Sequence, residues 1–113
     1  MDEFKALAQS PNSLTVCGAP EGFDALIFCD ALRARGGVGL YIATDEARAS
    51  AFAAAARVFA PDLDQLRLLG WDCQPYDRIS PSPRTAARRA GALHKLAQRE
   101  ASDTSPLLVI STV

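Results

Sequence analysis

The sequence predicts an α/β domain in which a mainly parallel sheet forms the middle of three layers and helices cover both faces. The chain has 113 residues, the size of one domain, so we expect a single subdomain over residues 1–113. Hydrophobic residues make up 49% and charged residues 22%, as in folded proteins. Short β-prone runs alternate with helical segments in the order β-α-β-α-β-α-β, which is typical of a parallel sheet.

The first strand and helix are expected between residues 14 and 35. Residues 14–18 (L-T-V-C-G) form a short β-prone run. In residues 23–35 the apolar positions recur at helical spacing. Gly36 and Gly37 follow at once, and glycine commonly ends a helix.

The second strand and helix follow directly. Residues 38–43 (V-G-L-Y-I-A) read as a buried strand, and residues 44–59 as an alanine-rich helix. Thr44 or Asp45 can accept a hydrogen bond from the free amides of the first turn. The helix is expected to stop before Pro61.

The last third predicts two more strands with a long loop and a helix between them. Residues 65–69 are a weaker strand, residues 70–83 a proline-containing loop, residues 84–100 a helix, and residues 107–113 (L-L-V-I-S-T-V) an apolar fourth strand. The helix places small residues and a histidine roughly on one stripe: Ala87, Ala90 or Gly91, His94 and Ala97. Because a parallel sheet usually needs a further helix after such a strand, we expect a fragment from the start of a larger multidomain protein.

Charge and hydropathy exclude several classes. Twelve basic and 13 acidic side chains give a net charge of −1, which is unfavourable for an independent DNA-binding protein. No apolar run reaches 18 residues, and Met1-Asp2-Glu3 is acidic where a signal peptide is basic. We therefore expect a cytoplasmic chain without a membrane segment.

No metal or cofactor site is expected. The three cysteines, Cys17, Cys29 and Cys73, form no C-x-x-C pair, and His94 is the only histidine. A catalytic triad would have to use His94, which lies in a helical pattern, where a surface or packing role is expected. We therefore predict no catalytic residues.

The turn before the first helix resembles a phosphate-binding loop that has lost its essential residues. From Gly18, the pattern G-x-x-x-x-G-K-[ST] requires a glycine at Phe23 and a lysine at Asp24. Gly22 is one position early, and Glu21 and Asp24 would repel a polyphosphate. Gly18, Glu21, Gly22 and Asp24 therefore mark a degenerate phosphate loop, with at most a weak anion site at the helix N-terminus.

Two segments are candidate interaction surfaces. Six basic residues lie in the last third of the chain: Arg78, Arg84, Arg88, Arg89, Lys95 and Arg99. Arg84, Arg88 and Lys95 share one helical face, which could contact a phosphate backbone or an acidic partner, or simply be solvated. The loop contains Trp71, Asp72, Tyr76 and Asp77, which form either a binding surface or a plug on the sheet.

Three stretches resemble the N-terminal region of bacterial transcription-repair coupling factors. They are G-x-P-E-G-F-D-A-L at residues 18–26, F-A-P-D at residues 59–62, and W-D-C-Q-P-Y-D-R-I-S-P at residues 71–81. The third is the most specific, and the resemblance extends over residues 14–113. It implies a UvrB-like module with a helicase-like (RecA-like) α/β fold, a degenerate form of the P-loop NTPase fold.

The resemblance also implies a function through a larger parent protein. Members of this family are ATP-dependent DNA translocases that displace stalled RNA polymerase at DNA lesions and recruit excision-repair proteins, including UvrA. We expect this piece to be a non-catalytic scaffold whose partners are other domains of the parent, and UvrA, RNA polymerase and DNA through the parent. Two alternatives stay open: a small α/β nucleotide-binding enzyme, and a nucleic-acid-binding module using the helix from Arg84 to Arg99.

Overall fold

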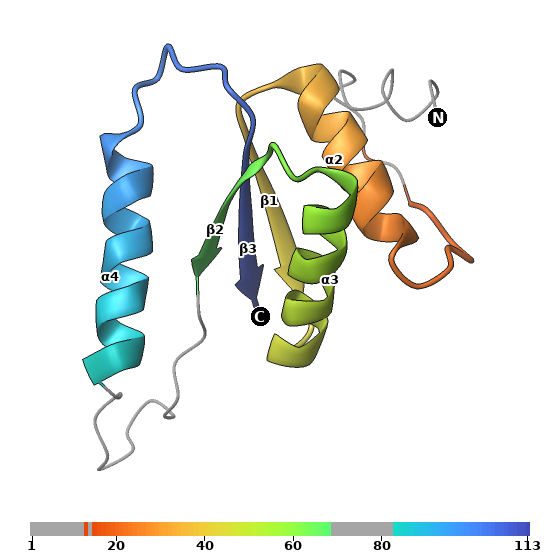
Figure 1. Ribbon diagram of the computed structural model, residues 1–113, viewed down its shortest axis with the longest axis horizontal. Helices are drawn as coiled ribbons and strands as arrows, with labels where there is room; N and C mark the ends of the chain where they lie inside the picture. Colours follow the sequence, from red (N-terminus) through yellow and green to blue (C-terminus); the bar gives the residue numbers. More distant parts are fainter. Residues whose placement is uncertain (1–12, 14, 69–82) are drawn as a thin grey trace.

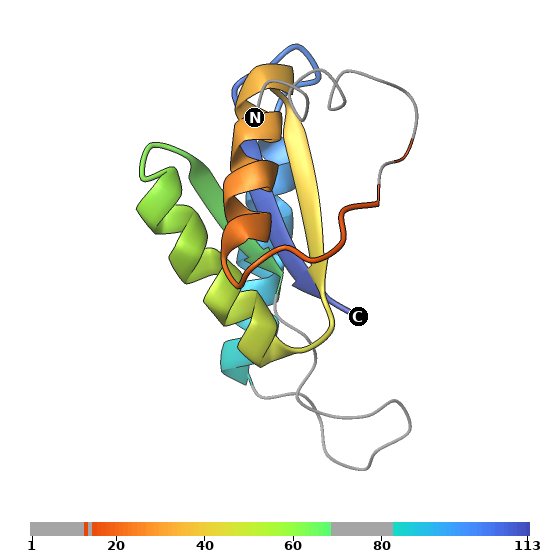
Figure 2. The same cartoon turned by 90° about the vertical axis from the view of Figure 1, so that its right-hand side faces the viewer.

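The computed structural model describes residues 13, 15–68 and 83–113. In this part of the chain three parallel strands form one sheet, in the order β1-β3-β2. Helices lie on both sides of it (Figures 1 and 2). The elements are α2 (Phe23–Arg35), β1 (Val38–Ala43), α3 (Glu46–Phe59), β2 (Asp64–Leu68), α4 (Pro83–Gln98) and β3 (Leu107–Thr112). The predicted α/β class, with helices packed on a parallel sheet, is thus confirmed.

Strand β3 is the centre of the sheet because it is the most apolar strand and pairs on both edges. Leu107 lies opposite Val38 of β1 on one side and Asp64 of β2 on the other. Its four consecutive apolar residues, Leu107, Leu108, Val109 and Ile110, are all buried. Since successive side chains point to opposite faces, burial of all four requires cover on both faces.

The main core lies between the sheet and the helices α2 and α3. Ala25, Cys29 and Leu32 are the buried residues of α2. Helix α3 packs alongside with Phe52 and Ala56, which are 3% and 0% exposed. Gly39 allows α2 to approach β1, because an added Cβ there would lie 3.0 Å from Leu32 Cδ1. The small residues of α3 therefore serve packing, as alanine-rich helices in cores commonly do.

Helix α3 begins with the predicted cap. The Asp45 side chain accepts a hydrogen bond from the Arg48 amide at 2.8 Å. At the other end the Ala60 amide donates to the Ala56 carbonyl at 2.8 Å, just before Pro61. Both bounds of this helix could therefore be predicted from local sequence.

The predicted strand at residues 14–18 is wrong for the residues that the structure describes. Residues 15–18 belong to no strand and are exposed. Gly18, at φ +72°, and Pro20 break the extended run immediately afterwards. A β-prone run becomes a strand only through pairing, and these residues make no ladder contact with the sheet. The described order is therefore α-β-α-β-α-β.

The stripe of small residues and His94 on α4 is not the side that the helix turns toward the sheet. Ala87, Ala90, His94 and Ala97 are exposed. The side toward the sheet carries the buried or half-buried residues Thr85, Ala86, Arg89, Ala92 and Leu96. Leucine and the aliphatic stems of arginine remove more apolar surface from water than alanine does, which explains this orientation.

Candidate functional site

A groove opens beside the carboxyl end of β1, where open parallel sheets commonly hold ligands. Its volume is about 940 Å³. It lies between the turn preceding α2 and the outer side of α3, with Tyr41 and Phe52 contributing from the core. Its charged lining residues are Glu21, Asp24, Asp45 and Arg48. The groove therefore contains three of the four predicted phosphate-loop residues, Glu21, Gly22 and Asp24, and leaves Gly18 outside.

The turn itself presents a carboxylate where a phosphate loop presents free amides. Gly22 has φ +84° and, as the N-cap of α2, offers no side-chain acceptor. Instead Asp24 Oδ1 accepts from the amide of Ala25 at 2.9 Å. Its other oxygen, Oδ2, accepts from the Tyr41 hydroxyl at 3.0 Å. An anion at this helix end would have to displace a carboxylate already bonded to two donors.

The electrostatics of the groove also oppose anions. Three carboxylates, Glu21, Asp24 and Asp45, face one guanidinium, Arg48, and no lysine lines the groove. Asp45 is already used as the α3 cap. The lining is therefore negative at neutral pH and unsuited to a polyphosphate.

Tyr41 is held by aromatic packing beneath the groove. Its ring stacks on Phe52 with 3.5 Å between centroids and 9° between planes, and Phe28 meets both rings edge-on. Burial, and then the hydrogen bond to Asp24, raise the pKa of Tyr41 above its ordinary 10.0. The hydroxyl therefore stays protonated and donates to Asp24, a positioning role.

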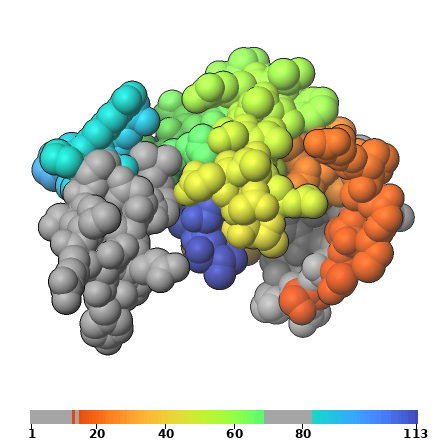
Figure 3. Space-filling view, turned by 90° about the horizontal axis from the view of Figure 1, so that it is seen from below, coloured from red at the N-terminus to blue at the C-terminus, as the bar shows by residue number. Residues whose placement is uncertain are grey.

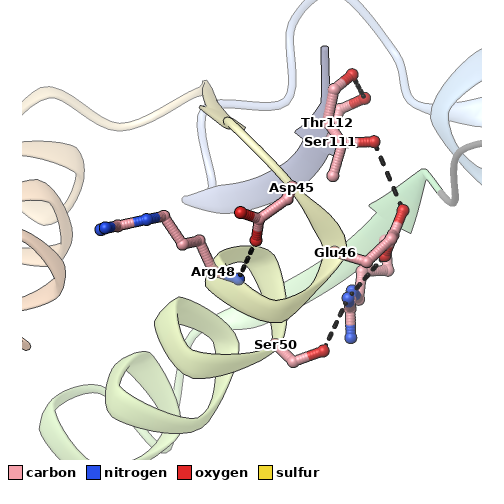
Figure 4. A network of polar contacts seen from close by, with 7 residues as sticks. Asp45, Glu46, Arg48, Ser50, Ser111 and Thr112 are labelled. Carbon is pink, nitrogen blue, oxygen red and sulfur yellow. Dashed lines mark hydrogen bonds and ion pairs between the residues drawn. The ribbon is translucent and has the colours of Figure 1, made fainter.

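A second polar cluster joins three elements at the same end of the sheet (Figure 4). Glu46 Oε2 accepts from Arg67 Nη2 at 3.0 Å, and the same nitrogen donates to Ser50 Oγ at 3.0 Å. Glu46 Oε1 accepts from the Thr112 hydroxyl at 3.3 Å. The cluster thus ties α3 to β2 and β3. The sequence showed Glu46 only as an acid in a first helical turn, because its partners lie 21 and 66 residues away.

The predicted basic cluster is divided by the fold. Arg84, Arg88 and Lys95 are exposed on the outer side of α4. Arg99 is turned inward: its side chain is 13% exposed, lies 3.7 Å from Asp103 Oδ1 and donates to the Ser105 carbonyl. It borders a second cavity of about 430 Å³ beside the starts of β2 and β3. Five of the six predicted residues are therefore placed, and only Arg84, Arg88 and Lys95 share the outer face.

The remaining candidates are either outside the described residues or add no site within them. The predicted loop residues Trp71, Asp72, Tyr76, Asp77 and Arg78 lie outside the described residues, as does Cys73. His94 is exposed on α4. Cys29 is buried, and burial raises the pKa of its thiol, so it stays protonated.

Within the described ranges, no three histidine, cysteine or acidic side chains are grouped so that they could hold a metal ion. Nor is any helix in that part of the chain long and apolar enough to cross a membrane.

Comparison with known proteins adds no relative: no protein-family model, curated protein or solved structure matches the chain significantly.

Proposed function

We propose that the chain is a non-catalytic, UvrB-like module from the N-terminal region of a transcription-repair coupling factor. Its role is to support and present neighbouring protein domains, through which the parent meets UvrA, RNA polymerase and DNA. The motifs at residues 18–26, 59–62 and 71–81 carry the resemblance. In this proposal the parallel α/β domain is a helicase-like (RecA-like) fold.

One observation supports the non-catalytic reading most directly. In the position where a working P-loop offers amide donors and a lysine, this chain has Asp24 bonded to its own helix and to Tyr41. A carboxylate there stabilises the turn without any phosphate. This supports a domain that keeps the shape of a nucleotide-binding unit without its ligand.

Titration with ATP and magnesium tests this reading against the alternative of a small nucleotide-binding enzyme. We expect calorimetry to detect no saturable binding, because the groove is acidic and its helix N-terminus is occupied. The double variant Glu21→Gln/Asp24→Asn is titrated in the same way, because it removes both negative charges from the turn. Saturable micromolar binding by the unmodified chain would contradict the proposal.

The interaction role is tested separately in the full-length parent. Asp72→Lys and Asp77→Lys reverse charges in the loop that carries the most specific motif. We expect a change in UvrA recruitment or in basal ATPase activity. If both stay at the level of the unmodified parent, the loop has no regulatory role.

A further inference from the structure

Helix α4 concentrates positive charge on a chain that is slightly acidic overall. Its 16 residues contain Arg84, Arg88, Arg89 and Lys95 and no acidic residue. The whole chain has a net charge of −1, so the residues outside α4 are clearly negative. The near-neutral net charge is thus the sum of a positive α4 and a negative remainder of the molecule.

The fold places this positive charge away from the acidic groove. Figure 3 shows α4 at one flank, with the segment leading into α2 at the opposite flank and the start of α3 between them. Arg84, Arg88 and Lys95 are exposed, and none of the three has an ion-pair partner among the described residues. They are therefore available to an anionic partner.

Arg84, Arg88 and Lys95 are spread in a line along α4 rather than gathered at one point. Residues at i, i+4 and i+11 lie near one face of a helix, and Arg84 and Lys95 are separated by about 16 Å along the axis. Duplex DNA carries one charge per ~1.7 Å of its axis, so a line of this length meets several phosphates. Between the cations lie the exposed small residues Ala87 and Gly91, which allow close approach.

The residue types favour a duplex over other polyanions. Protein interfaces centre on buried aromatic anchors, and single strands stack on aromatic side chains. The sequence of α4 contains no Phe, Tyr or Trp. Two of the three exposed cations are arginines, whose planar guanidinium groups suit phosphate.

We propose that Arg84, Arg88 and Lys95 form a contact surface for the phosphate backbone of duplex nucleic acid, without sequence specificity. This surface goes beyond the proposed scaffold role, and it lies on the other flank of the molecule from the acidic groove. It supplies a weak, salt-dependent contact that positions the domain beside a duplex.

Fluorescence anisotropy of a short labelled DNA duplex at several salt concentrations tests this proposal. Three phosphate contacts predict that log K falls with log salt with a slope of about −2.7. The double variant Arg84→Gln/Arg88→Gln should reduce this slope to about −0.9. The matched control Arg48→Gln/Arg57→Gln removes the same charge from exposed positions on α3 and should leave the slope unchanged. Circular dichroism confirms that both variants remain folded.

Three results would overturn the assignment. The first is no binding even at the lowest salt concentration. The second is an equal loss in the control pair, which would reflect net charge alone. The third is displacement of the duplex by polyglutamate as effectively as by unlabelled duplex, which would assign the surface to an acidic protein partner.

Discussion

At the scale of single residues, the chain uses its acids mainly to hold its own backbone and arginines in place. Asp24 bonds the start of α2, Asp45 caps α3, and Glu46 bonds Arg67. Each of these carboxylates lies where an enzyme of this architecture would place groups that face a ligand. In the groove, Asp24 and Asp45 already bond the Ala25 amide, the Tyr41 hydroxyl and the Arg48 amide, which leaves few donors for a ligand.

Asp62 gives a pH prediction at this scale. Its hydrogen bond with Arg33, and then its own backbone amide, hold the pKa of the Asp62 carboxyl below its ordinary 3.8. Because the folded pKa is lower than the unfolded one, this stabilisation is complete above about pH 4. It is lost as the pH falls through the folded pKa.

Urea unfolding from neutral to strongly acidic pH measures this effect. Asp62→Asn should lower the unfolding midpoint at neutral pH, and its difference from the unmodified chain should shrink below pH 3.8. Asp64→Asn is the control, since the described structure gives Asp64 no ion pair. A difference for Asp62→Asn that stays constant down to the lowest pH would contradict the prediction.

At the scale of elements, the turn between α2 and β1 depends on two glycines for different reasons. Gly36 has φ +73° and Gly37 has φ +76°, conformations that other residues adopt with strain. A Cβ on Gly36 would also lie 2.6 Å from the Thr104 carbonyl oxygen, whereas one on Gly37 would meet nothing within 4 Å. The Gly37 amide donates to that same carbonyl at 2.9 Å. The turn therefore holds the connector, the segment between α4 and β3 that contains Thr104.

Alanine substitution separates the two contributions. Gly37→Ala should cost about 1 kcal/mol of unfolding free energy, from backbone strain alone. Gly36→Ala should cost a further ~1–3 kcal/mol, because the connector must also move. Chemical denaturation of both variants measures the difference. Equal losses would mean that the connector yields freely and that the close contact with Thr104 has no energetic consequence.

Local sequence was sufficient for most elements at this scale. The helix ends at Gly36 and before Pro61, the Asp45 cap and the two apolar strands β1 and β3 were all predicted close to their observed bounds. The strand expected at residues 14–18 was wrong for the described residues, and the sequence did not indicate which face of α4 packs on the sheet. Strand formation depends on a pairing partner, and the orientation of a helix depends on the element it packs against. Neither partner can be identified from the sequence of the short segment itself.

At the scale of the whole molecule, one edge of the sheet carries exposed apolar side chains. In the described sheet β1 is an edge strand, and Val38, Leu40 and Ile42 are 49%, 54% and 58% exposed on the face turned away from α2 and α3. None of its six residues is charged or proline, the usual protections of an edge strand. The opposite edge, β2, contains Asp64 and Arg67 and lies against α4.

The exposed apolar residues of β1 predict that the chain self-associates through this strand. Ile42→Lys should raise the concentration at which light scattering increases and leave the unfolding free energy within about 0.5 kcal/mol, because the site is a surface one. Leu93→Lys is the control, since Leu93 is 46% exposed but lies on α4. An equal gain in solubility from both variants would show that added charge alone is responsible.

The candidate site was only partly visible in the sequence. Glu21, Gly22 and Asp24 stood out because their spacing almost fits a phosphate loop, and the structure places all three at the groove. The sequence does not identify Tyr41, Phe52 and Asp45 as site residues. They come from β1, α3 and the cap of α3, and only the fold brings them to the groove beside the turn. The division of the basic cluster was equally invisible, because it depends on which side of α4 faces the sheet.

The sequence by itself determined the class of fold, through periodic apolar residues and capping residues that act within a few positions along the chain. It also determined that the phosphate loop lacks its lysine and its second glycine. Only the tertiary structure decided that Asp24 is bonded to Tyr41, that Arg99 is withdrawn from the basic face, and that β1 lies at an edge. These outcomes follow from contacts between distant segments, whose free energy depends on the packed arrangement rather than on any one segment.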